Sequence, residues 1–148
     1  MDDIDRAIIN RIQSNFPITS KPYHTIAQEL NISEKDVLNR IQNLKDNQII
    51  RRIGANFVPE KMGYVSTLCA AHVPDHLLDS FADIVNQNKG VTHNYIRDNY
   101  YNVWFTIIAP SMDHIETFLH TITEQTSVHQ ILNLPSTHVF KIKAQFNV

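Results

Sequence analysis

Three polar residues, His93, Tyr95 and Arg97, alternate along one short stretch of the chain. If this stretch is a β-strand, its successive side chains point to opposite faces, so these three share one face. Histidine can carry a proton near neutral pH or bind iron, and arginine can bind carboxylates through two parallel hydrogen bonds. The row therefore indicates a site for an anionic, aromatic ligand that can contain iron. His93 and Arg97 are the candidate catalytic residues, although a structural role for His93 stays open.

Five further side chains are candidates for binding such a ligand. Trp104, on the next predicted strand, could stack on an aromatic ring, although core packing is the alternative. His72 stands at a strand end and is a secondary candidate. Arg51, Arg52 and Lys141 could bind carboxylates. The alternatives are a solvated wing or phosphate contacts for the two arginines, and a solvated strand face for the lysine.

The composition is that of an ordinary globular protein, with 43% hydrophobic and 19% charged residues among 148. A single cysteine excludes an internal disulfide and a cysteine-based zinc site. His72 and His76 lie on either side of Pro74, so they do not form a helical zinc-binding pair. The apolar runs are too short to span a bilayer, and the first residues are acidic rather than basic, so we expect a cytoplasmic protein without membrane contact.

The first third of the chain has the pattern of a helix-turn-helix. Apolar residues four apart predict a helix over 3–14, a second helix fits 23–30, and Ser33 can cap a third that runs to about residue 47. Residues 49–53 then predict the start of a β wing. We therefore expect a winged helix-turn-helix domain over 1–54.

After residues 54–63 the pattern changes to strand, helix, strand, strand, helix, strand. The strands are predicted at 64–73, 91–97, 101–109 and 137–146. This βαββαβ order predicts a ferredoxin-like domain over 63–148, with both helices on one face of an antiparallel sheet, and hence an α+β protein. The other face is left uncovered and normally needs a partner, so we expect a dimer.

Six segments in the same order along the chain carry a further signal. They are Phe16-Pro17 with Lys21-Pro22-Tyr23, Ile50-Arg51-Arg52-Ile53-Gly54-Ala55, Gly63-Tyr64-Val65-Ser66-Thr67, Val91-Thr92-His93-Asn94-Tyr95, Tyr101-Asn102-Val103-Trp104-Phe105-Thr106, and Leu132-Asn133-Leu134-Pro135 leading to Phe140-Lys141-Ile142. The chain as a whole resembles the Lrp/AsnC family of regulators. These segments are similar to a specialised branch of it, the siroheme decarboxylase subunits of haem and haem d1 biosynthesis.

The resemblance implies an enzyme, a carbon-carbon lyase that removes the C12 and C18 acetate carboxyls of siroheme and leaves 12,18-didecarboxysiroheme. It implies no cofactor beyond the substrate, whose own iron His93 could bind as an axial ligand. It also implies a heterodimer of two related subunits, with a homodimer as the other option. The segments 55–57 and 66–71 are closer to the alpha-type subunit.

The alternative function is that of a ligand-sensing transcriptional regulator, and the residues argue against it. Residues 1–53 contain eight Lys and Arg against seven Asp and Glu, a net charge of +1, and residues 54–148 contain five against eight, a net charge of −3. Neither part has the basic balance of a nucleic-acid-binding domain. The predicted recognition helix has no net charge and has two acids in its first turn, where contacts to bases usually begin. We therefore expect no DNA binding.

Overall fold

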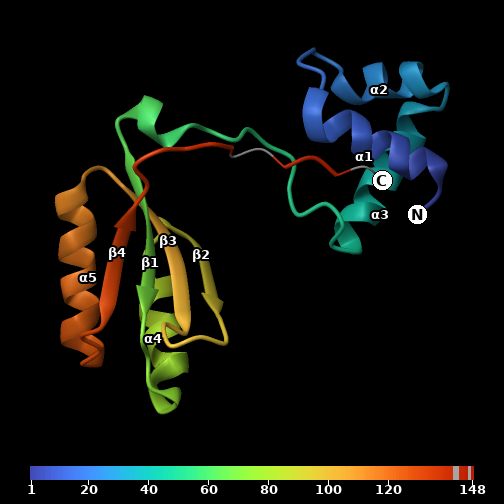
Figure 1. Ribbon diagram of the computed structural model, residues 1–148. Helices are drawn as coiled ribbons and strands as arrows, with labels where there is room; N and C mark the ends of the chain where they lie inside the picture. Colours follow the sequence, from blue (N-terminus) through green and yellow to red (C-terminus); the bar gives the residue numbers. More distant parts are fainter. Residues whose placement is uncertain (142–143, 147) are drawn as a thin grey trace. The chain divides into compact units, whose positions relative to one another are not determined.

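The computed structural model describes residues 1–148 except 142, 143 and 147. It divides the chain into two compact units (Figure 1). The first contains Met1–Ala55 together with Lys141–Val148, and the second contains Asn56–Phe140. The domains predicted from the sequence cover 1–54 and 63–148; in the structure the described residues that follow Phe140 group with the first unit instead.

The first unit is built on three helices, α1 (Asp3–Asn15), α2 (Pro22–Leu30) and α3 (Glu34–Asp46). Each helix has an apolar stripe, and the three stripes meet in one core. Its fully buried or nearly buried members are Ile8, Ile26, Ala27, Val37 and Ile41. This arrangement confirms the predicted helix-turn-helix.

Polar residues fix where these helices begin and end. Asp2 accepts a hydrogen bond from the backbone N–H of Asp5, and the Asp5 carboxylate accepts one from the N–H of Asp2, which is a capping box. Ser33 accepts from the N–H of Asp36 and caps α3. Asn31 ends α2 in the left-handed conformation, with φ 53°, which asparagine tolerates better than most residues.

The β wing predicted to start at residues 49–53 does not form there, and these residues are not in a strand. The backbone N–H groups of Ile49 and Ile50 both donate to the carbonyl of Leu44 at the end of α3. Ile50 and Ile53 pack their side chains against the helical core. Apolar packing and this helix-end turn therefore replace strand pairing.

The second unit is a four-stranded sheet with two helices and two short 3-10 turns. The strands are β1 (Val65–Ala71), β2 (Val91–Ile96), β3 (Val103–Ala109) and β4 (Ile131–Pro135), the helices are α4 (Leu78–Asn86) and α5 (Met112–Thr126), and the 3-10 turns are η1 (Pro59–Met62) and η2 (Asp75–Leu77). The strand order is β2-β3-β1-β4, and every neighbouring pair is antiparallel. This is the predicted α+β architecture.

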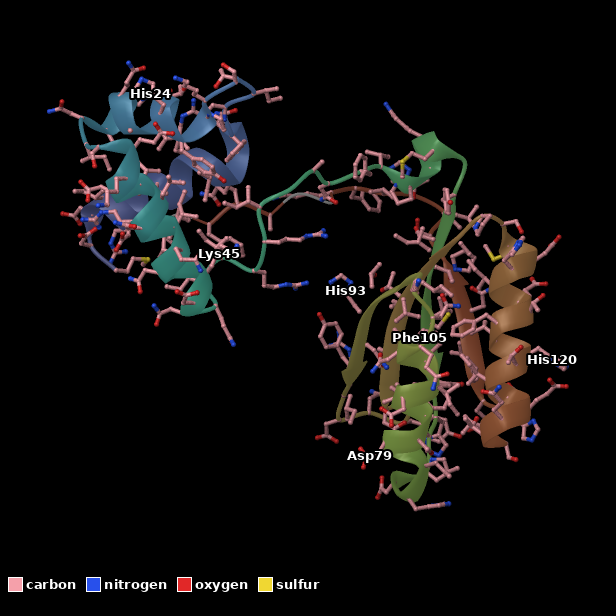
Figure 2. All side chains as sticks on the ribbon, turned by 180° about the vertical axis from the view of Figure 1, so that it is seen from behind. His24, Lys45, Asp79, His93, Phe105 and His120 are labelled. Carbon is pink, nitrogen blue, oxygen red and sulfur yellow. The ribbon has the colours of Figure 1, made fainter. Side chains whose placement is uncertain are left out.

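One face of the sheet is covered by α4 and α5. Phe105 of β3 and Cys69 of β1 are fully buried there against Phe81 of α4 and against Ile115 and Ile122 of α5. Phe105 meets Phe81 edge to face, with ring centroids 6.4 Å apart. Figure 2 labels Phe105 within this layer and His120 on α5. Both helices are on one side, so the alternate residues of each strand lie on a face that no element of this unit covers.

The fourth strand was predicted in the wrong place. The sequence predicts it at 137–146, but the structure forms β4 at Ile131–Pro135 and places no described residue of 137–146 in a strand. Helix α5 ends at Thr126, and Ser127 follows in the left-handed conformation, so the chain re-enters the sheet within a few residues. Leu132 and Leu134 then pair with Ala70 and Leu68 of β1.

The described residues of the C-terminal segment are hydrogen bonded to α1. Gln13 donates from Nε2 to the carbonyl of Phe146 at 2.7 Å and accepts from its N–H at 3.0 Å, so one side-chain amide pairs with both backbone groups. Asn10, one turn earlier, donates to the carbonyl of Val148 at 3.1 Å.

Among the described residues, no helix is both long and apolar enough to span a membrane.

Candidate functional site

The uncovered sheet face, which we call the open face, is formed by alternate residues of all four strands. The strand register places them in rows: His93, Thr106, Leu68 and Leu134 form one, and Tyr95, Trp104, Ala70 and Leu132 form the next. The intervening residues of β3, including Val103, Phe105 and Ile107, are buried on the helix side. The open face is therefore polar and aromatic at β2 and β3, and apolar at β1 and β4.

Arg97, Tyr95 and Trp104 form one cluster on this face. Tyr95 pairs directly with Trp104. The Arg97 guanidinium carbon lies 6.0 Å from the Tyr95 ring centroid and 5.9 Å from that of Trp104, within range of cation–π attraction. Trp104 is itself fixed, because its Nε1 donates to the carbonyl of Tyr101 at 2.6 Å. The cluster offers two aromatic surfaces beside a cation that forms no ion pair within the described part of the chain.

His93 lies at an irregular position of β2. The pairing between β2 and β3 shifts between Val91 and His93, and His93 then pairs with Thr106. Its Nδ1 is 3.0 Å from the Thr92 hydroxyl, which can donate or accept, so this contact does not fix the ring's tautomer. The His93 ring is 5.9 Å from the Tyr95 ring. The side chain is exposed and labelled in Figure 2.

His72 follows β1 and continues the alternation of Leu68 and Ala70 onto the open face. Its ring stacks on Tyr100, with centroids 4.2 Å apart and an angle of 4° between the planes. Its Nδ1 lies 2.5 Å from the backbone carbonyl oxygen of Tyr100. The Tyr100 hydroxyl donates to Gln130 at 2.7 Å, and the Gln130 carbonyl accepts from the His72 N–H. The sequence did not suggest that Tyr100 or Gln130 belongs here.

The apolar part of the open face was also missed from the sequence. Leu68, Leu132 and Leu134 are 40%, 37% and 40% exposed and lie next to one another on β1 and β4, so together they form an exposed apolar patch. The alternation along β1 could have identified Leu68. The two others were missed because the fourth strand was predicted after them.

The three remaining predicted residues, Arg51, Arg52 and Lys141, belong to the first unit. The two arginines line a cavity of about 660 Å³, and its other lining residues are apolar or small apart from Gln13. The large apolar side chains among them come from α1, from the residues directly after α1, from those after α3 and from the C-terminal segment: Ile9, Ile12, Phe16, Ile18, Ile49, Ile50, Ile53 and Phe146. Lys141 is exposed. Lys143, two residues after Lys141 on the predicted last strand and a further cation that could bind carboxylates, lies outside the described residues.

Two other groups bear on what chemistry the chain can perform. Burial raises the pKa of the Cys69 thiol to about 12, so it is protonated at neutral pH and is no nucleophile. Within the described residues, no group of three or more His, Cys, Asp or Glu side chains could hold a metal ion.

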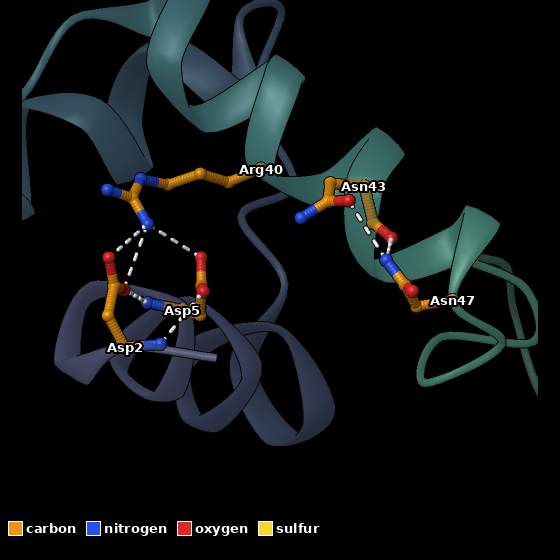
Figure 3. A network of polar contacts seen from close by, with 5 residues as sticks. All are labelled: Asp2, Asp5, Arg40, Asn43 and Asn47. Atoms are coloured by element: carbon orange, nitrogen blue, oxygen red, sulfur yellow. Dashed lines mark hydrogen bonds and ion pairs between the residues drawn. The ribbon is translucent and has the colours of Figure 1, made fainter.

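Arg40, in the middle of α3, is paired with two acidic residues at the start of the chain (Figure 3). Arg40 donates from Nη1 to both carboxylate oxygens of Asp2, at 2.9 and 2.8 Å, and to Asp5 at 2.8 Å. The N–H of Asp5 and the guanidinium of Arg40 lower the pKa of Asp2. Farther along the helix, Asn47 donates to the carbonyl and side-chain oxygens of Asn43. Arg40 thus stabilises the packing of α3 on α1 instead of pointing freely to solvent.

Comparison with known proteins agrees with this architecture. Residues 61–141 match the model of the AsnC-like ligand binding domain, and residues 5–51 match that of the siroheme decarboxylase NirDL-like HTH domain. A siroheme decarboxylase alpha subunit from Desulfovibrio desulfuricans is 48% identical over 148 residues, which cover 100% of this chain and 85% of the relative. One from Nitratidesulfovibrio vulgaris is 45% identical and is covered to 84%.

Among solved structures, the siroheme decarboxylase NirDL superposes with a TM-score of 0.72 at 29% identity, over 99% of this chain. The chain spans about half of NirDL, since the match covers 48% of it. NirDL has also been solved with an iron-uroporphyrin III analogue, at a TM-score of 0.71. The fold and the open face thus define an AsnC-type chain with a helix-turn-helix unit and a ligand-binding unit. Within that class, the chain belongs to the siroheme decarboxylase family.

Proposed function

We propose that this chain is a subunit of siroheme decarboxylase that converts siroheme to 12,18-didecarboxysiroheme without oxidation. The observation that carries the proposal is the open face, where Arg97, two aromatic rings and two histidines lie on one surface. Siroheme is a flat, carboxylate-bearing iron tetrapyrrole, and this set of groups suits each of its parts. Family membership supplies the substrate.

The reaction is that of a carbon-carbon lyase, and it needs a proton donor but no redox partner. The bond between the acetate CH2 and its carboxylate breaks, CO2 leaves, and the electron pair stays on the CH2 carbon attached to the ring. A proton then converts that carbon to a methyl group. Each acetate therefore consumes one proton and releases one CO2, twice per siroheme. No cofactor is required beyond siroheme, whose iron belongs to the substrate.

In this proposal each residue of the cluster has one task. Tyr95 and Trp104 form the wall on which the macrocycle rests. Arg97 binds a carboxylate, and its planar fork favours bidentate pairing. His93, exposed beside this cluster, supplies the proton, because histidine is the side chain that most readily exchanges protons near neutral pH. Arg51, Arg52 and Lys141 are further carboxylate-binding groups.

The chain is proposed to act in a heterodimer of related subunits, as an alpha-type subunit. The open face exposes Leu68, Leu132 and Leu134 next to its polar part. A second sheet packed on these leucines would bury them and would shield the site from water, which strengthens charged interactions within it. A cytoplasmic location is also part of the proposal, since a free thiol such as Cys69 stays reduced there.

We do not propose a transcriptional role. Arg40 is paired with Asp2 and Asp5, and the exposed residues at the start of α3 include Glu34 and Asp36. Phosphate contacts from lysine and arginine supply most of the affinity of DNA-binding proteins. A titration with duplex DNA at low salt should show only weak binding, and tight binding would favour the regulator.

The proposal is tested by incubating the full chain with siroheme under anaerobic conditions, with and without a related subunit, and measuring the mass of the tetrapyrrole. Loss of two CO2 is the expected result. An unchanged mass with a shifted absorption spectrum would mean that the chain senses or carries the tetrapyrrole without converting it.

A further inference from the structure

The contacts of His72 distinguish it from every other histidine in the described part of the chain. It is the one whose ring nitrogen faces a backbone carbonyl, that of Tyr100. It is also held by ring stacking on Tyr100, and Tyr100 is held in turn by its hydrogen bond to Gln130. Tyr100 is 57% exposed, so this stack is not explained by packing of a core. The three side chains form an ordered group on an exposed surface.

The carbonyl contact determines which nitrogen of His72 carries the proton. A backbone carbonyl oxygen can only accept a hydrogen bond, so Nδ1 must be the protonated nitrogen. In the neutral imidazole the lone pair is then on Nε2. Histidines that bind metals usually have this arrangement, in which Nδ1–H donates to a carbonyl or carboxylate while Nε2 faces the metal. In neutral His72 the hydrogen bond to Tyr100 therefore leaves Nε2 as the nitrogen that can bind a metal.

His93 has neither a fixed tautomer nor a stacked ring. Its Nδ1 contacts a hydroxyl, which permits either tautomer, and its ring stacks on no neighbour. The positions also differ: His93 pairs with Thr106, and Thr106 pairs with Leu68, four residues before His72 on β1. His93 and His72 are thus separated by two strand spacings across the sheet and four residues along it, which puts their Cα atoms about 16 Å apart. One histidine can thus lie at the centre of a bound macrocycle while the other lies at its edge.

We propose that His72 binds the iron of the substrate tetrapyrrole through Nε2, with Tyr100 and Gln130 as the residues that position its ring. This rests on the proposed function, and it separates two tasks that the sequence alone left together at His93. His72 binds the iron at the centre of the macrocycle, and His93 delivers protons at its periphery, where the acetates are attached.

The test uses the full chain, with any subunit that co-purifies, and iron(III) uroporphyrin III as the probe. The measured quantities are the electron paramagnetic resonance spectrum of the bound iron and the dissociation constant. Metal-free uroporphyrin III is the matched control ligand, because it has the carboxylates but nothing for His72 to bind. The wild type should show a nitrogen-ligated iron and should bind the iron probe more tightly than the metal-free one.

His72→Gly should lose the nitrogen signature and the preference for the iron probe, and added imidazole should restore the signature. Tyr100→Ala, which changes an exposed side chain, should weaken binding of the iron probe about 10-fold, the lower end of the range for residues that orient a metal ligand. It should not change binding of the metal-free probe. His93→Gly, and His120→Gly on α5, should both retain the nitrogen signature.

A nitrogen signature that persists in His72→Gly, or that disappears in His93→Gly instead, would overturn the inference. If His72→Gly does not fold, judged by circular dichroism, the Tyr100→Ala result decides: equal weakening for both probes would also overturn it. The proposed function fails separately, if the wild type leaves the mass of siroheme unchanged. A wild type that decarboxylates siroheme without a nitrogen-ligated iron would refute only the role of His72.

Discussion

Replacing Arg97 tests whether the open face binds carboxylates. The guanidinium lies beside two aromatic rings and has no described acidic partner, so Arg97→Gln should leave the fold intact, with the free energy of unfolding changed by no more than about 0.5 kcal/mol. A charge-assisted hydrogen bond contributes about 1.5–3 kcal/mol, and the lower value applies to an exposed side chain. Arg97→Gln should therefore raise the dissociation constant for iron uroporphyrin III about 10-fold.

Arg97→Lys should fall between the wild type and Arg97→Gln, because lysine keeps the charge but lacks the planar fork and stacks less well on aromatic rings. Binding is measured by absorption titration at two salt concentrations. The matched control is Arg6→Gln, which removes an exposed arginine from α1 in the first unit. An unchanged dissociation constant in Arg97→Gln, or an equal loss in Arg6→Gln, would show that no specific carboxylate contact is made at Arg97.

Three other predictions concern stability and reactivity. Gly90→Ala should destabilise the chain by about 1–3 kcal/mol in denaturant unfolding, because the new Cβ would lie 2.3 Å from a backbone carbonyl oxygen of β3, whereas Gly54→Ala, with nothing within 4 Å, should be nearly neutral. Cys69 should resist alkylation at pH 8 in the folded chain and react after unfolding, since burial raises its pKa to about 12; rapid labelling of native protein would contradict this. Because the folded chain lowers the pKa of Asp2, the stability that it contributes with Arg40 is present above the ordinary aspartate pKa near 4 and is lost as pH falls through the lower folded value. Asp2→Asn should flatten the acid limb of the stability curve, and an identical acid limb in the variant would refute this.

Local signals explain what could be predicted from the sequence. Ser33 caps α3 as expected, because capping depends on residues within one turn, and Ser111 caps α5 in the same way. Strict alternation placed His93 and Tyr95 on one face of β2, and the structure brings Trp104 and His72 to the same face. The prediction of a shared face for His93 and Tyr95 needed only the period of a strand, whereas the face of His72 and Trp104 was not predicted.

What failed depended on partners distant in the sequence. Residues 137–146 alternate well enough to predict a strand, but the edge of β1 pairs with Ile131–Pro135. Nothing local reveals which of two adjacent segments will fill one sheet edge, and the choice decided whether Leu132 and Leu134 would reach the open face. The support that Tyr100 and Gln130 give to His72 was hidden for the same reason, because the three residues come from three separate segments.

The two hydrogen bonds between the Gln13 side chain and the backbone of Phe146 affect how the two units can be expressed separately or exchanged. The first unit is discontinuous: the chain leaves it after Ala55 and re-enters it at Lys141, so the sheet unit is an insertion within the helical one. Cutting the gene once between the units would deprive α1 of its partner segment. A domain exchange with a relative should therefore transplant residues 56–140 as a cassette and keep both flanking pieces from the same parent.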